Sequence, residues 1–162
     1  MKTTNIIRGL GLAHLALALC LLGMTGSARA GEKCTIEGTN LAEESEYTQQ
    51  YVIDVGDMPG HQVRIFEVHR KFLEPTPNCE GLKEVETWVW GYSDYTDGNG
   101  RAWGYFTDIY DNGDKMFGEW SGTSQRLPKP VGQATGVYTG TSIITGGTGV
   151  YKGVRGTGRD TV

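Results

Sequence analysis

Three short glycine-framed segments in the C-terminal half limit what this chain can fold into. "GEWSG" (Gly118–Gly122), "GVYTG" (Gly136–Gly140) and "GVYKG" (Gly149–Gly153) each place an aromatic residue midway between two glycines. In a β-strand alternate side chains point to one face, so each ring would share its face with two stretches of bare backbone. The ring can spread over those gaps, and glycine lets a sheet coil sharply. The pattern favours a small, strongly curved β-sheet.

The glycine-rich stretch "ITGGTGVYKGVRGTG" (Ile144–Gly158) has six glycines in fifteen positions but does not match a phosphate-binding loop. A dinucleotide-binding loop needs Gly-x-Gly-x-x-Gly at the start of a helix. After Gly147 and Gly149 the third glycine position is Lys152, and no segment with helical periodicity follows. A P-loop needs a Gly-Lys pair, and the chain contains none. These two nucleotide-binding motifs are excluded, and no motif predicts a cofactor.

Short alternating segments separated by Gly, Pro, Asn and Asp recur along the chain, and none keeps a helical period for three turns. Many short strands with such turn residues are typical of a sandwich or a barrel. The stretch "RLPKPVG" is expected to be one of the connecting loops. The sequence predicts strands at Thr35–Thr39, Tyr47–Val55, His61–Phe72, Val85–Tyr95, Arg101–Tyr110, Lys115–Gly122, Ala134–Thr145 and Val150–Gly158. We therefore expect an all-β fold, an antiparallel closed β-barrel of about eight strands.

A near-repeat marks the middle of the chain: "WGYSDYTDGNG" begins at Trp90 and "WGYFTDIYDNGD" at Trp103. Each is an aromatic strand that runs into an Asp/Asn/Gly turn, which predicts two successive hairpins. The aspartates lack the closing glutamate of an EF-hand calcium loop. They are expected to be turn residues.

The first thirty residues have the pattern of a secretory signal peptide. Lys2 and Arg8 form a charged start, Leu10–Met24 is mostly apolar, and "ARA" ends at Ala30 with small residues where signal peptidase cuts. Cleavage after Ala30 would leave residues 31–162 as a single secreted or periplasmic domain. It would remove three of the 15 basic residues and none of the 19 acidic ones, which gives a net charge of −7. That charge argues against nucleic acid or anionic lipid as the main partner, and the short apolar run argues against stable membrane insertion.

Three cysteines become two once Cys20 leaves with the signal peptide. In an oxidising compartment Cys34 and Cys79 are expected to form a disulfide, which stabilises by about 4 kcal/mol in the chain-entropy model. The alternative is two buried free thiols. No metal site is predicted, because His61 and His69 would lie about 26 Å apart along one strand.

The segment I-x-G-G-T-G-x-Y-x-G-x-x-G resembles the late strand pair of the allene oxide cyclase and dirigent β-barrels. Those families carry a Gly-Gly-Thr/Ser-Gly turn followed by an aromatic residue and further glycines. The resemblance implies an eight-stranded antiparallel barrel with an interior cavity, and Arg155 stands where dirigent proteins often carry an arginine. The matching positions here are Gly146, Gly147, Thr148, Gly149, Tyr151, Gly153 and Gly156.

A row of three large aromatic residues on one face of a predicted strand suggests the first of three functions. Trp88, Trp90 and Tyr92 could line a site for a small, partly apolar or aromatic ligand in the barrel interior, because such pockets are commonly lined by aromatic residues. The ligand and the oligomeric state stay open, as do the faces that line the interior.

Two other functions stay open beside ligand binding. A cyclase-like or dirigent-like enzyme would guide the cyclisation or coupling of a reactive intermediate, which needs little more than a polar group or two in an apolar cavity. Its catalytic candidates are Arg155, Asp108 and Glu67. The third function is that of a structural or partner-binding barrel without a cavity.

Overall fold

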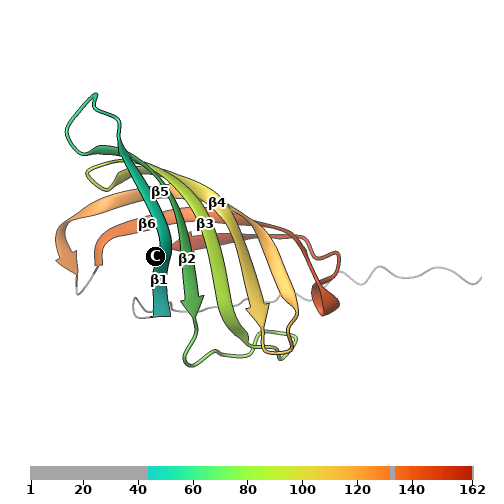
Figure 1. The fold of residues 1–162 in the computed structure, drawn as a ribbon. Coiled ribbons are helices and arrows are strands. Elements are labelled where there is room, and N and C mark those ends of the chain that lie inside the picture. The colour runs from blue at the N-terminus through green and yellow to red at the C-terminus, as the bar shows by residue number, and fades with distance from the viewer. Residues whose placement is uncertain (1–43, 132–133, 162) are drawn as a thin grey trace, which may run out of the picture. The chain divides into compact units, whose positions relative to one another are not determined.

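The computed structural model describes residues 44–131 and 134–161. They form one antiparallel sheet with almost no helix, in which strand order equals chain order (Figure 1). The all-β prediction is confirmed. The strands are β1 (Ser45–Asp54), β2 (His61–Lys71), β3 (Glu84–Thr96), β4 (Asn99–Tyr110), β5 (Lys115–Val131), β6 (Ala134–Gly147) and β7 (Gly156–Thr161), with one 3-10 turn, η2 (Gly149–Tyr151), before β7.

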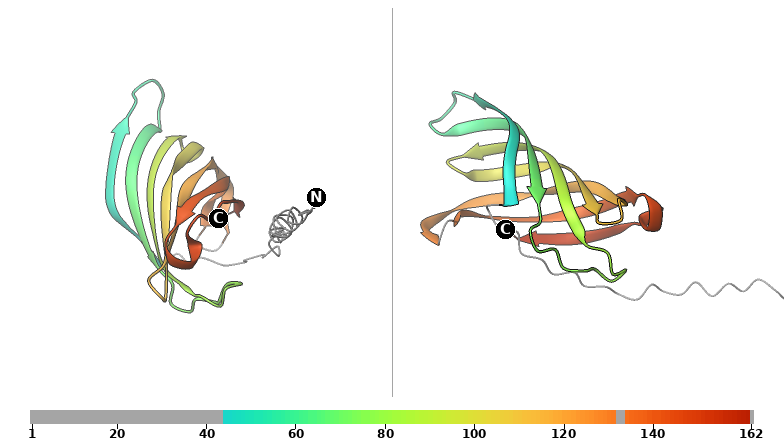
Figure 2. Two further views of the ribbon diagram at one scale, coloured as in Figure 1. Left: turned by 90° about the vertical axis from the view of Figure 1, so that its right-hand side faces the viewer. Right: turned by 60° about the horizontal axis from the view of Figure 1, so that its bottom comes forward.

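The sheet is strongly curved, and its strands follow one another round a trough (Figure 2). Within the described residues the sheet is open, because β1 pairs only with β2 and β7 pairs only with β6. The predicted strand Thr35–Thr39 lies outside the described residues, so the eighth strand stays a prediction. No helix in the described part of the chain is long and apolar enough to cross a membrane.

The two hairpins predicted from the near-repeat are confirmed by the pairing of β3 with β4 and of β4 with β5. The first turn consists of Asp97 and Gly98, whose φ angles are 50° and 80°. Positive φ at both central residues is the geometry that lets a two-residue turn follow the twist of its strands. The Asp-Gly pair is therefore the local cause of the β3–β4 register.

The predicted loop "RLPKPVG" is wrong in part, because β5 continues to Val131. The pairing with β6 is regular up to Arg126, which lies opposite Gly136, and shifts before Val131 lies opposite Ala134. Pro128 lies in this irregular stretch. A proline has no N–H for the ladder, so it is tolerated where regular pairing is interrupted.

The last predicted strand, Val150–Gly158, is also wrong in part. Its first residues form η2, and β7 begins only at Gly156. Asp114 accepts a hydrogen bond from the Val150 backbone N–H (3.0 Å), and the ring of Tyr151 packs on that of Tyr110 with centroids 4.5 Å apart. These two contacts hold the segment in a turn, although its alternating sequence suits a strand.

Candidate functional site

The two faces of the sheet differ in packing. Phe66, Gly91, Gly104 and Trp120 lie in register across β2, β3, β4 and β5. With strands about 4.8 Å apart, Phe66 and Trp120 would start roughly 14 Å from each other. Their ring centroids are nevertheless 6.3 Å apart, because both rings lean over Gly91. This contact across two strands marks the concave face of the sheet.

Glycines on the concave face make room for these rings. A Cβ on Gly91 would come within 2.3 Å of the Phe66 ring and 2.8 Å of the Trp120 ring. A Cβ on Gly122 would lie 2.6 Å from the hydroxyl of Tyr138, which comes from the neighbouring strand. The glycine-framed pattern therefore does shape the curved sheet, and the rings cover glycines of other strands as well as of their own, since Tyr138 also lies over Gly140 of β6.

One end of the concave face holds a group of polar side chains that we call the acid cluster: Glu84, Thr87, Asp108 and Arg70. Thr87 and Asp108 are paired residues of β3 and β4, and both are buried, with 5% and 8% of their surface exposed. The Thr87 Oγ1 lies 3.1 Å from Asp108 Oδ1 and also contacts Glu84 Oε1. A hydroxyl donates only one hydrogen bond. Both contacts are hydrogen bonds only when one carboxyl is protonated and donates to the Thr87 oxygen.

The surroundings of the acid cluster favour protonated carboxyls. Burial raises the pKa of Asp108 well above its ordinary value, and the negative charge of Glu84 raises it further. Burial also raises the pKa of Glu84. The hydrogen bond from Thr87 and the positive charge of Arg70 oppose both pKa shifts. Desolvation is the dominant cause, since a buried carboxylate loses its hydration.

Residues of the two outer strands, β1 and β7, interact with the acid cluster. Arg70 on β2 donates from Nε to the Ser45 Oγ of β1 (2.9 Å), which fixes its guanidinium near the two carboxyls. Asp160 on β7 is half-buried, and burial raises its pKa. Its charge also raises the pKa of Asp108. Three carboxyls from β3, β4 and β7 thus interact on the concave face.

Aromatic and cationic side chains extend the concave face beyond the acid cluster. Arg64 lies over the rings of Tyr47, Phe66 and Tyr95, with its guanidinium carbon 5.6, 5.2 and 5.9 Å from their centroids. Tyr138 Oη is buried and has no hydrogen-bond partner among the described residues. Burial raises the pKa of Tyr138 to about 12. An orphaned hydroxyl of this kind is a donor that a ligand or a water molecule could satisfy.

A buried, protonated carboxyl can act in two ways on a bound molecule. It can donate a hydrogen bond to a carbonyl, ether or hydroxyl oxygen, or it can transfer its proton as a general acid. Phe66 and Trp120 supply apolar surface on the same face, in register with Gly104, four residues along β4 from Asp108. Among the described residues no group of three or more His, Cys, Asp or Glu side chains is arranged to hold a metal ion.

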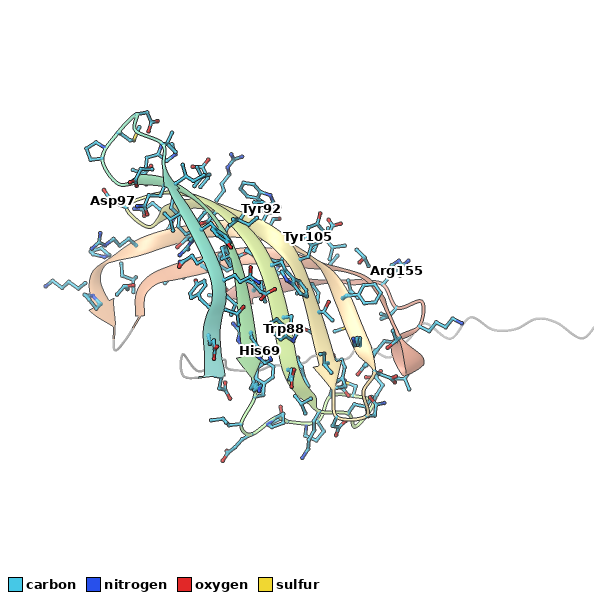
Figure 3. The ribbon with its side chains drawn as sticks, viewed as in Figure 1. His69, Trp88, Tyr92, Asp97, Tyr105 and Arg155 are labelled. Carbon is cyan, nitrogen blue, oxygen red and sulfur yellow. The ribbon has the colours of Figure 1, made fainter. Side chains whose placement is uncertain are left out.

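The predicted ligand-binding row lies on the opposite, convex face. Trp88, Trp90 and Tyr92 alternate with the buried residues of β3, and Trp90 and Tyr92 are about two-fifths exposed. Trp88 stacks between His69 and Trp90, with ring centroids 4.0 and 6.4 Å away. Figure 3 labels Trp88, Tyr92 and His69 on the sheet. The three predicted residues share one face, and that face is not the one carrying the acid cluster.

The three catalytic candidates lie at separate places. Asp108 belongs to the acid cluster. Glu67 lies on the convex face, where its carboxylate accepts hydrogen bonds from Trp90 Nε1 (2.7 Å) and Thr48 Oγ1 (2.6 Å). Arg155 lies in the exposed turn before β7 and donates to the Val154 carbonyl (2.7 Å). The structure does not bring these three together.

Sequence reasoning missed Glu84, Thr87 and Arg70 as partners of Asp108. Thr87 lies within the predicted strand Val85–Tyr95 and carries no distinguishing signal. Arg70 shares its face of β2 with the apolar Phe66 and Val68 but also with Arg64, so that face is mixed in the sequence. A charged residue next to apolar ones was therefore only a weak signal for a buried polar site.

Only one of the two cysteines of the predicted disulfide is among the described residues. Cys79 lies in the connection between β2 and β3, and Cys34 lies outside the described residues, as do the signal peptide and its cleavage site. The Cys34–Cys79 bond and the cleavage after Ala30 therefore stay predictions.

Comparison of this chain with protein-family models, with curated proteins and with solved structures gives no match.

Proposed function

We propose that this protein binds a small, partly apolar molecule on the concave face of its sheet, with Asp108 donating a hydrogen bond to an oxygen of that molecule. The observation that carries the proposal is the burial of Asp108 beside Glu84 in surroundings that raise its pKa. The raised pKa favours the protonated carboxyl, whose proton can be offered to an acceptor. The aromatic side chains of Phe66 and Trp120 supply the apolar part of the site.

We further propose that the sheet closes into an eight-stranded barrel of the allene oxide cyclase and dirigent kind. Thr35–Thr39 would supply the eighth strand, between β1 and β7, which each have an unpaired edge in the described sheet. Unpaired edges are normally covered or closed in native proteins. Closure would turn the concave face into an interior and exclude water from the acid cluster.

The signal-peptide pattern supports a location outside the cytoplasm for this binding function. We propose a secreted or periplasmic protein that begins at Gly31 after cleavage. A net charge of −7 then suits a soluble carrier or binding protein better than one that binds nucleic acid.

The four tryptophans allow the binding face to be identified by fluorescence. Trp120 lies on the concave face, and Trp88, Trp90 and Trp103 lie on the convex face. A variant with the three convex tryptophans replaced by Phe reports only from Trp120, and Trp120→Phe reports only from the others. Titration with monocyclic phenols and medium-chain fatty acids should change the first signal saturably and leave the second unchanged.

Two other results would contradict the concave-face proposal. A saturable change in Trp120→Phe alone would move the site to the convex face, where the sequence placed it. A flat response in both variants, for every compound, would favour the structural barrel without a cavity.

Substitutions at Asp108 separate binding from catalysis. Asp108→Asn keeps the volume and a hydrogen-bond donor, so affinity should stay within about threefold of the native value, whereas Asp108→Ala should lose about tenfold. Glu67→Gln, a carboxylate change on the convex face, is the matched control and should have no effect. Equal affinities of Asp108→Ala and the native protein would exclude the proposed donor.

A dirigent-like or cyclase-like enzyme is the second candidate, because a protonated carboxyl in apolar surroundings can also serve as a general acid. An amide cannot transfer that proton. Asp108→Asn would then bind with nearly native affinity yet lose product formation from a reactive intermediate. If Asp108→Asn formed product as the native protein does, the enzymatic role of Asp108 would be excluded and the binding function would stand.

A further inference from the structure

The convex face changes character between β4 and β5. β4 carries large aromatic residues on this face, whereas β5 and β6 carry small hydroxyl residues beside them. Trp103 is in register with Ser121, and Ser121 is in register with Thr141. This step leaves a shallow depression of about 150 Å³. Its side chains on the convex face are Trp103, Tyr105, Glu119, Ser121, Thr141 and Ile143.

The Trp103 indole lines this depression and is 42% exposed. Tyr92 of β3 stacks on it, with centroids 5.9 Å apart and planes 16° from parallel. The guanidinium carbon of Arg101 also lies over the ring, 6.0 Å from its centroid, while Arg101 Nη2 lies 3.9 Å from Asp94 Oδ2 of β3. The exposed part of the indole is therefore the surface that Trp103 offers to a molecule in the depression.

Glu119 and Glu67 both lie beside aromatic residues on the convex face, but they differ in their hydrogen bonds. The oxygens of Glu67 are both engaged, by Thr48 and by the Trp90 indole. Glu119 lies opposite Tyr105 and Ile143, and among the described residues it forms no side-chain hydrogen bond or ion pair. Both of its oxygens can accept hydrogen bonds from a molecule in the depression.

We propose that this depression binds one six-membered-ring unit of a neutral glycan. The C–H bonds on one face of a sugar ring carry partial positive charge and pack on the negative face of an aromatic ring. Trp103 supplies that surface. A carboxylate accepts two neighbouring sugar hydroxyls, which is the role of Glu119, and the hydroxyls of Ser121 and Thr141 face the same ring.

The size and openness of the site match one unit of a longer chain. Pockets for isolated drug-sized ligands enclose about 300–1,000 Å³, whereas this depression has about 150 Å³ and lies on the sheet surface. A single sugar ring fits, and the neighbouring units of the chain would extend over the sheet on either side. The site is on the opposite face from the acid cluster and does not depend on the concave-face proposal.

The test is a two-dimensional amide NMR titration of the protein as exported, with hexasaccharides of β-1,4-glucose, α-1,4-glucose, β-1,4-N-acetylglucosamine and mannose. At least one should shift the signals of Ser121, Thr141 and the Trp103 indole saturably, and leave those of Thr87 and Asp108 unchanged. Trp103→Ala and Glu119→Gln should each weaken binding by about tenfold or more.

Two matched variants control for damage to the fold. Trp103→Phe keeps an aromatic ring in the stack with Tyr92 and should bind within about threefold of the native protein. Glu67→Gln changes a carboxylate whose oxygens are already engaged and should bind normally. If Glu67→Gln weakened binding as much as Glu119→Gln, the specific role of Glu119 would be refuted.

Three outcomes overturn the proposal. One is the absence of saturable shifts with all four hexasaccharides. Another is that the shifts occur at Thr87 and Asp108. The third is a self-associated protein in analytical ultracentrifugation that becomes monomeric in Trp103→Ala and shows no sugar-dependent shifts, because the depression would then be covered by a second copy of the chain.

Discussion

Phe66 on β2 and Trp120 on β5 meet above Gly91 and Gly104, although two strands separate them. A flat sheet cannot bring these rings to 6.3 Å, so the contact depends both on curvature and on the absence of side chains between them. The missing side chain at Gly91 therefore leaves the space in which the two rings meet.

Replacing Gly91 by alanine should destabilise the fold, because the new Cβ would lie 2.3 Å from the Phe66 ring. Overpacking of this kind costs about 1–3 kcal/mol. The measurement is urea unfolding, with Gly156→Ala as control, whose Cβ would meet only the end of the Ile144 side chain at 3.2 Å. Equal losses in the two variants would show that the ring contact over Gly91 is not strained.

Gly147→Val should also lower the free energy of unfolding, by about 1–3 kcal/mol. Gly147 is not among the glycines with positive φ, which in this turn are Gly149 and Gly153. The loss would come from space, since a Cβ at Gly147 would lie 2.5 Å from Tyr151 Cβ and 2.6 Å from the Lys115 carbonyl oxygen. Thermal unfolding of Gly147→Ala tests this reason, because alanine introduces the same Cβ without β-branching and should lose stability too.

The raised pKa of Asp108 predicts a pH dependence of stability. A carboxyl whose pKa is higher in the folded state makes its full contribution to the free energy of unfolding below its unfolded pKa of about 3.9. As pH rises from about 3.9 through the raised pKa, this contribution is lost, because the carboxyl ionises less readily in the folded protein than in the unfolded chain. Free energies of unfolding measured from pH 4 upward should fall more steeply for the native protein than for Asp108→Asn. Parallel curves would contradict the prediction.

His61 should titrate above its ordinary pKa of about 6.5. Its Nε2 is 2.9 Å from Asp94 and its Nδ1 is 2.5 Å from Asp57, and the hydrogen bond to Asp94 is the largest cause of the raised pKa. Stability from this pair is present below pH 6.5 and is lost as pH rises through the raised value. In an NMR titration, the pKa of His61 should fall further in Asp94→Asn than in Asp57→Asn. The reverse order would show that Asp57, and not Asp94, makes the main contribution to the raised pKa.

The exported protein should begin at Gly31 and contain no free thiol. Intact-mass measurement gives the N-terminus, and a thiol assay on denatured, unreduced protein gives the state of Cys34 and Cys79. A retained leader or a lipidated Cys20 would contradict export by this route. Two reactive thiols would contradict the disulfide without affecting the cleavage prediction.

Local sequence signals were sufficient for most of the described strands. Asp97 and Gly98 set the β3–β4 turn through their own backbone preferences, and alternation located β1 to β4 within about two residues. The errors arose where a distant contact opposed the local pattern. Asp114 holds the backbone of Val150 in η2, and no feature of the segment around Val150 contains that information.

The acid cluster was only partly predictable for the same reason. Asp108 was a candidate, yet its partners reach it through the register of β2, β3 and β4. The pairing shifts between Glu84 and Glu86, which lets Glu84 reach the hydroxyl of Thr87 three residues away. Such a bulge re-aims a side chain without leaving a sequence pattern.

Because strand order equals chain order, every ladder in this sheet can form without a distant segment having to arrive first. The two-residue turn at Asp97 can close early, and each further strand then needs only the next stretch of chain. Pairings between consecutive strands keep the contact order low for an all-β protein, and low contact order speeds folding. Refolding from β3 and β4 outward would therefore bring Thr87 and Asp108 together among the first native contacts, before β7 adds Asp160.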